Sequence, residues 1–144
     1  MCSSDLLTPD EQYTHISLWC LLTAPLLIGC DMTRLDPFTL SLLSNDEVLA
    51  VDQDALARQA SRVSQSGTQQ VWAKDMEDGS KAVGLFNLSR LSTKVDAKWS
   101  DLGLTGKQRV RDLWRQKDLG QFSDQFKATV PPHGVVLVRM WPVK

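Results

Sequence analysis

The short apolar segment Pro25–Gly29 constrains the fold of this chain more than any other feature. It is a continuous run of aliphatic residues bounded by proline and glycine, which is typical of a parallel strand buried on both faces of a sheet. A parallel strand needs parallel neighbours, and the sequence offers no second run of this kind. We therefore expect the hydrogen-bonding partners of this strand to lie outside the given chain.

Helices are predicted on both sides of this strand, each starting with a capping residue and a proline or acidic first turn. They cover about Pro9–Thr23 with Thr8 as cap and Glu11 closing a capping box, Pro37–Ser44 with Asp36 as cap, and the residues from Asn45, the third cap, through Asp52. The segment Ile16–Leu22 is apolar on nearly every face, so it must be buried against more than one neighbour.

The sequence period changes after Gly67, where short β-prone runs alternate with turn residues. The predicted strands are Gln70–Lys74, Ala82–Leu88, Ser92–Trp99, Gln108–Trp114, Phe126–Val130 and Val135–Trp141. Turn residues at Glu77–Ser80, Thr105-Gly106 and Pro131–Gly134 predict antiparallel hairpins. Six or more such strands make a β-sandwich, and Arg58–Gly67 is interpreted as the crossing into it.

Length and composition exclude several classes of protein. A chain of 144 residues is too short for a complete (β/α)8 barrel, which takes about 250 residues. A hydrophobic content of 42% and a net charge of -1 suit a globular protein and leave no electrostatic footprint for nucleic acid or an anionic membrane. The apolar stretch Ile16–Cys30 is shorter than the ~20 residues of a membrane span, and no Lys or Arg precedes it as in a signal peptide.

The cysteines and histidines do not predict a metal site or a catalytic triad. Cys2, Cys20 and Cys30 have neither C-x-x-C spacing nor a histidine pair nearby. Because Cys20 and Cys30 lie among leucines, we interpret both as buried free thiols rather than as a disulfide. His15 is expected to pack on a helix flank, and His133 to serve the conformation of a turn.

Four segments carry a family resemblance: Leu7–Gln12, His15–Trp19, Ala24–Gly29 with Asp31, and Asn45–Asp54. Together they closely resemble the C-terminal part of the alpha-galactosidase (melibiase) family, glycoside hydrolase family 27. In that family they form the last helix-strand-helix of a (β/α)8 TIM barrel, which a C-terminal antiparallel β-sandwich follows. The resemblance implies an α/β plus all-β chain, with residues 1–60 as the incomplete barrel end and residues 61–144 as the sandwich.

The resemblance also implies a reaction. Family members are retaining glycosidases that remove terminal α-linked galactose without a metal or organic cofactor, using two aspartates about 5 to 5.5 Å apart. Those aspartates belong to Lys-Tyr-Asp and Trp-Asn-Asp type motifs, and neither motif occurs here: Tyr13 is the only tyrosine, between Gln12 and Thr14. No residue is therefore assigned a catalytic role. We expect the chain alone to be inactive on α-galactosides and to need the missing N-terminal barrel segment as its partner.

Three aspartates are weighed as site residues. Asp31 follows the predicted strand and so lies at the barrel mouth, which makes it a candidate for the rim of the substrate pocket. Its alternative is a loop residue that caps backbone amides or pairs with Arg34. Asp52 and Asp54 do not face one another on a helix, so solvated or capping carboxylates are favoured over catalytic ones.

The tryptophans Trp72, Trp99, Trp114 and Trp141 on the predicted strands leave a second function open. Aromatic faces stack on sugars, so the alternative function is a non-catalytic sandwich module that binds carbohydrate or a partner chain. Core packing is the competing and favoured interpretation of large aromatic side chains. The arginines Arg109, Arg111 and Arg115, with the nearby acids Asp101, Asp112 and Asp118, are interpreted as a salt-bridged, solvated face.

Overall fold

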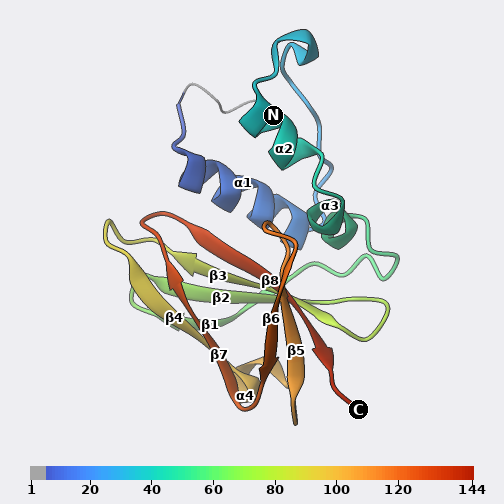
Figure 1. The fold of residues 1–144 in the computed structure, drawn as a ribbon, viewed down its shortest axis with the longest axis vertical. Helices are drawn as coiled ribbons and strands as arrows, with labels where there is room; N and C mark the ends of the chain where they lie inside the picture. The colour runs from blue at the N-terminus through green and yellow to red at the C-terminus, as the bar shows by residue number, and fades with distance from the viewer. Residues whose placement is uncertain (1–5) are drawn as a thin grey trace.

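Helices rest on one face of a β-sandwich in the computed structural model, which describes residues 6–144 (Figure 1). The helical part contains α1 (Pro9–Leu21), η1 (Met32–Arg34), α2 (Pro37–Leu43) and α3 (Asp46–Asp52). The sandwich contains β1 (Ser61–Ser66), β2 (Gln69–Asp75), β3 (Lys81–Asn87), β4 (Thr93–Lys98), α4 (Trp99–Leu102), β5 (Gln108–Asp112), β6 (Lys117–Phe122), β7 (Gln125–Val130) and β8 (Val135–Pro142).

The helix starts follow from their caps. Thr8 Oγ1 accepts from Glu11 N at 3.3 Å, and Glu11 Oε2 accepts from Thr8 N at 2.8 Å, which confirms the predicted capping box. Asp36 and Asn45 cap α2 and α3 as predicted. The first helix ends slightly earlier than expected, because Thr23 takes a left-handed φ of 53° that a helix cannot continue.

All strand pairs in residues 6–144 are antiparallel. The larger sheet has the order β1-β2-β3-β8-β5-β6, and β4 pairs with β7 in the smaller one. The interpretation of Arg58–Gly67 as a crossing is wrong for Ser61–Ser66, which is the edge strand β1. The opposite edge, β6, also escaped prediction. Both edges are largely exposed on both faces, so neither shows the alternating apolar pattern by which a strand is predicted.

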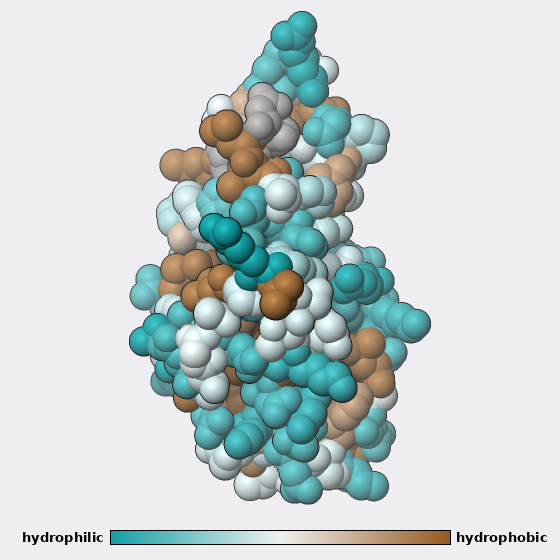
Figure 2. All heavy atoms as spheres, turned by 90° about the vertical axis from the view of Figure 1, so that its left-hand side faces the viewer, coloured by the Kyte–Doolittle hydropathy of each residue, from teal (hydrophilic) through white to brown (hydrophobic). Residues whose placement is uncertain are grey.

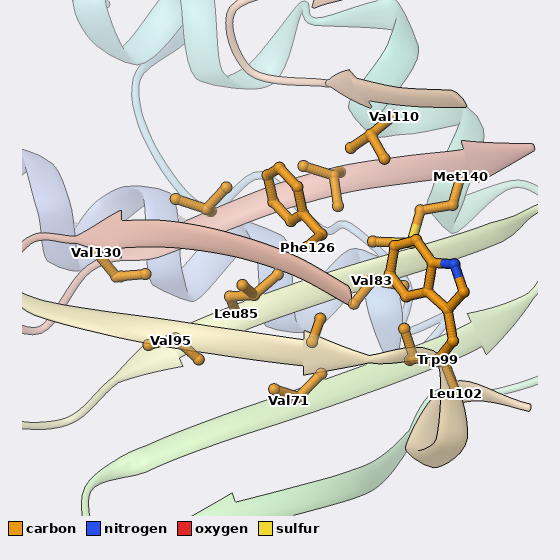
Figure 3. Packing of buried hydrophobic residues seen from close by; sticks show 13 residues of the cluster. Val71, Val83, Leu85, Val95, Trp99, Leu102, Val110, Phe126, Val130 and Met140 are labelled. Carbon is orange, nitrogen blue, oxygen red and sulfur yellow. The ribbon is translucent and has the colours of Figure 1, made fainter. Parts of the chain in front are cut away.

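Two hydrophobic cores lie on opposite faces of the larger sheet. Figure 3 shows the inter-sheet core, where residues such as Val83, Leu85, Trp99, Phe126 and Met140 point toward one another. The second core joins helices to sheet, with Ile16, Cys20 and Leu21 of α1 and Val48 and Val51 of α3 packed toward Ala82 and Leu137. The helices thus cover the outer face of the central strands of the larger sheet.

Helix α1 approaches the sheet closely at Gly84 in β3. A Cβ atom at this position lies 2.7 Å from Leu21 Cδ1 and 2.6 Å from Phe86 Cε2, closer than real Cβ contacts allow. Glycine here lets α1 sit directly on the strand. The sandwich and the helical segment are therefore packed together rather than joined by a flexible link.

The predicted strand Pro25–Gly29 is not formed. The segment has no regular secondary structure, and Leu27 and Ile28 are 74% and 43% exposed. A buried parallel strand requires parallel neighbours, and residues 6–144 supply antiparallel pairs alone. Figure 2 shows hydrophobic atoms gathered over the helical part, above a more hydrophilic sandwich surface. None of the described helices is long and apolar enough to cross a membrane.

Candidate functional site

Asp31 lies at the start of the short helix η1, just after the apolar loop. Its carboxylate Oδ1 accepts from Thr33 N at 3.0 Å and from Thr33 Oγ1 at 2.6 Å. These two hydrogen bonds lower the pKa of the Asp31 carboxyl, which is exposed. The capping interpretation is confirmed, while a place at the rim of a sugar pocket stays a prediction.

Lys74 is a buried cation that sequence reasoning missed. Its side chain is only 1% exposed, and Nζ donates to Thr23 Oγ1 at 2.7 Å and to the carbonyl of Val51. Burial lowers the pKa of Lys74, and the negative charges of Asp54 and Asp52 partly offset this by raising it. The ammonium joins β2 to the C-terminal ends of α1 and α3. A lysine on a strand ordinarily predicts exposure, so no sequence signal marked it.

The two aspartates after α3 differ from each other. Asp54 is a capping carboxylate as predicted, since it accepts from Leu56 N and Glu77 N, both at 3.1 Å. Asp52 is half-buried, and its Oδ1 is buried without a hydrogen-bond partner within residues 6–144, so that oxygen is neither solvated nor capping. Burial raises the pKa of Asp52, and the nearby Lys74 charge opposes this. Asp54 therefore links the end of α3 to the β2–β3 turn, and Asp52 lies near Lys74 between the helices and the sheet.

The cysteine prediction is half right. Cys20 is a free thiol in the helix–sheet core, and burial raises its pKa to about 12, which makes it a poor nucleophile. The prediction for Cys30 is wrong, because Cys30 is disulfide-bonded. It follows the apolar loop and belongs to neither hydrophobic core, so its leucine-rich sequence neighbourhood was misleading. Cys2 lies outside the described residues.

Both histidines have conformational roles. His15 packs edge-on against Trp19 with ring centroids 5.5 Å apart, as predicted for a helix flank. His133 takes a φ of 52° in its turn, and its carbonyl accepts from Thr14 Oγ1 at 2.8 Å. Over the described range 6–144, no three His, Cys, Asp or Glu side chains are grouped as a metal site requires.

The four tryptophans do not share one sugar-stacking surface. Only Trp72 and Trp141 lie on strands, because β4 ends at Lys98, before Trp99, and β5 ends at Asp112, before Trp114. Trp99 lies between the sheets, while Trp72 and Trp114 pack against the helix–sheet core. Trp141 has Arg109 over its ring at 4.6 Å and Arg139 at 5.1 Å. The indole N–H groups of Trp72, Trp99, Trp114 and Trp141 donate to Gln70, Gly106, Ser17 and Asp78, respectively. Packing against the hydrophobic cores is the main role of these side chains, as the sequence analysis favoured. Among the four, Trp114 alone borders both of the pockets described below.

The arginine cluster is a salt-bridged face. Arg111 forms a two-pronged pair with Glu47 at 2.8 and 2.7 Å and lies 3.5 Å from Asp118. Arg115 lies 3.0 Å from Asp112. The prediction is confirmed for Arg111 and Arg115 with the acids Asp118 and Asp112, whereas Arg109 forms no ion pair within residues 6–144 and lies over the Trp141 ring instead. Asp101 takes no part in the ion pairs found in residues 6–144, and Glu47 replaces it from a distant segment.

Asn87 is a structural residue that the sequence analysis did not single out. The triplet Asn87-Leu88-Ser89 has the pattern of an N-glycosylation acceptor, which normally lies in a surface loop. Here Asn87 is fully buried, and Nδ2 donates to the carbonyls of Leu91, Val130 and Pro131 at 2.8 to 3.1 Å. In the folded chain this amide holds two connections together and is closed to a sugar.

Capped helices that cover one face of an antiparallel β-sandwich define an α/β plus all-β architecture. The chain belongs to the alpha-galactosidase family, glycoside hydrolase family 27. Residues 66–140 match the alpha galactosidase C-terminal beta sandwich domain, and residues 4–54 match the family described as alpha galactosidase A.

Two relatives illustrate the coverage. A probable alpha-galactosidase of Dictyostelium discoideum is 38% identical over 138 residues, which are 92% of this chain and 36% of the relative. Alpha-galactosidase 2 of Arabidopsis thaliana is 40% identical over 129 residues, 88% of this chain and 33% of the relative. The chain thus spans about a third of the length of the curated relatives it matches.

Solved structures agree with the family assignment. Alpha-galactosidase I from Mortierella vinacea superposes with a TM-score of 0.89 at 33% identity, over 93% of this chain and 36% of that one. A family 27 β-L-arabinopyranosidase from Geobacillus stearothermophilus gives 0.91 at 35% identity, over 96% and 31%. The same scaffold therefore accompanies more than one sugar specificity.

Proposed function

We propose that this chain is the C-terminal part of a retaining alpha-galactosidase that hydrolyses terminal α-linked galactose. Residues 1–60 complete the barrel, and residues 61–144 form the sandwich that supports it. The two family matches, which fall on either side of residue 60, support this division. The exposed apolar loop carries the proposal, because Leu27 and Ile28 belong to a segment patterned for burial in a parallel sheet.

On this proposal the chain contributes structure and the missing N-terminal segment contributes chemistry. Neither family motif that holds a catalytic aspartate occurs in the sequence. The chain alone is therefore inactive, and the N-terminal barrel segment is its partner. Asp31 then lies at the mouth of the completed barrel, where it borders the galactose pocket without acting on the glycosidic bond.

Fragment complementation tests this proposal. The chain is refolded alone and together with the part of the Dictyostelium relative that precedes the matched region, and cleavage of a chromogenic α-galactoside is followed. We expect no turnover by either piece alone and turnover with retained anomeric configuration by the mixture. Turnover by the isolated chain, or a stable mixed complex without activity, contradicts the proposal. The chain with Leu27 and Ile28 both changed to serine is the matched control, and it should complement poorly.

A further inference from the structure

Two adjacent pockets meet at the turn that follows β5. They measure about 80 and 270 Å³, and Tyr13, Trp114 and Arg115 line both. Figure 1 shows this turn rising from the sandwich beside α1 and α3. The remaining walls come from Asp10, Pro131 and Val135 in the smaller pocket and from Ser41, Ser44, Asn45 and Gln116 in the larger one. We call this pair the Trp114 pocket.

The aromatic wall of the Trp114 pocket is held in place. Tyr13 meets Trp114 with ring centroids 4.9 Å apart and meets Phe38 at 5.4 Å, both edge-to-face. The indole N–H of Trp114 donates to Ser17 Oγ at 2.8 Å. Tyr13 and Trp114 are each half-buried, so part of each ring faces the pockets. Rings fixed in this way bind a flat apolar surface with little loss of side-chain entropy.

Polar groups around this wall are uncommitted. Within residues 6–144, neither the Tyr13 hydroxyl nor the Asp10 carboxylate makes a hydrogen bond. Arg115 uses Nη1 for Asp112 at 3.0 Å, and its other guanidinium donors have no protein acceptor in the same range. The smaller pocket thus offers the Asp10 carboxylate as an acceptor and the remaining Arg115 N–H groups as donors, while the Arg115 charge is already paired with Asp112. A neutral ligand rich in hydroxyl groups matches this set.

We propose that the Trp114 pocket binds a pyranose unit of a neutral oligosaccharide, as a second sugar site separate from the galactose-cleaving one. The C–H face of the ring lies on the aromatic wall, and vicinal hydroxyls bridge Asp10 and Arg115, with the Tyr13 hydroxyl beside them. The combined volume falls in the range of small-molecule sites. The inference rests on this chain's own residues and stands whether or not the complemented enzyme is active.

Fluorine NMR of the full chain, labelled with fluorotryptophan, tests the site. The five tryptophans give separate resonances, and that of Trp114 is assigned by its absence from Trp114→Phe. Titration with raffinose should shift the Trp114 resonance, with a dissociation constant on the order of 1 mM, while buried Trp99 stays unmoved. Glycerol at equal concentration is the solvent control. Raffinose that leaves the Trp114 resonance in place overturns the proposal.

Two conservative variants locate the contacts. Tyr13→Phe and Asp10→Asn each remove one hydrogen-bonding group and should weaken raffinose binding about threefold to tenfold. Asp124→Asn is the matched control, since Asp124 lies exposed in the turn before β7. This variant should bind raffinose with the affinity of the parent chain. Thermal melting verifies that every variant is folded. Unchanged affinity in both pocket variants overturns the proposal. Loss of the raffinose-induced shift in the complemented enzyme also overturns it, because the barrel segment would then occupy the pocket.

Discussion

Asn87 shows how one amide can hold a β-sandwich together. Its three carbonyl acceptors are Leu91 in the connection after β3, Val130 at the end of β7 and Pro131 just beyond it. Asn87→Ala removes this donor from the buried Val130 carbonyl, so we expect it to lower the free energy of unfolding by about 2 to 3 kcal/mol. Urea denaturation measures the loss, with Gln121→Ala on the exposed edge strand as control. A loss below about 1 kcal/mol would contradict the anchoring role.

Asp78 ties the β2–β3 turn to β8. Burial raises the pKa of its carboxyl, but hydrogen bonds from Ser80, Arg139 and Trp141 outweigh this and hold the pKa well below its usual range. Because the folded pKa is depressed, the stabilisation is present above the unfolded pKa of about 3.9 and is lost as the pH falls toward the folded value.

The expected result is a steeper loss of stability in acid for the parent than for Asp78→Asn. Urea midpoints measured between about pH 5 and pH 3 report the difference, because the variant lacks the Asp78 carboxyl whose protonation costs stability. Asp124→Asn, on an exposed turn, serves as control and should keep the parent slope. Identical slopes for the parent and Asp78→Asn would show that the hydrogen bonds do not couple to folding.

At the scale of elements, Gly84 determines how closely α1 lies on the sheet. Gly84→Ala places a methyl group against Leu21 and Phe86, so we expect a loss of about 1 to 3 kcal/mol and a loosening of α1. Hydrogen exchange of the α1 amides measures the second effect. Val83→Ala, whose side chain points into the other core, should destabilise the sandwich without selectively exposing α1. Equal α1 exchange in both variants would contradict the proposed contact.

The elements with local signals were predictable from the sequence. The capping box at Thr8, the caps at Asp36 and Asn45, and the β-prone central strands of the sandwich depend on neighbouring residues and appear where expected. The polar edge strands β1 and β6 are fixed by pairing with distant strands instead. The segment Pro25–Gly29 has the pattern of a strand, but a strand forms only beside its partners.

The candidate site was less predictable for the same reason. The burial of Lys74 depends on Thr23 and Val51, which are far away in sequence and come together only in the tertiary fold. The Trp114 pocket likewise combines α1 with the β5–β6 turn. Trp114 and Tyr13 were each noted in the sequence, but nothing local indicated that their rings meet.

At the scale of the whole molecule, the apolar surface around Leu27 predicts that the isolated chain self-associates. Leu27, Ile28, Met32 and Leu40 are all strongly exposed. We expect the isolated chain to bind a hydrophobic dye and to associate with itself, and the complementing barrel segment to suppress both. Dye fluorescence and sedimentation with and without that segment measure this. A monodisperse monomer that binds no dye would contradict the expectation, and Leu27→Ser with Ile28→Ser should lower the signal.

The helix–sheet core determines where this protein can be cut and recombined. Ile16, Leu21, Val48 and Val51 cover the outer face of the larger sheet, so a chimera joined at residue 61 lacks the helix side of one of the two hydrophobic cores. A segment that can be moved to another enzyme as a folded unit must begin before α1, which belongs to the barrel in the architecture of this family. Exchange of sandwiches between enzymes of this family must therefore carry the last barrel helices along.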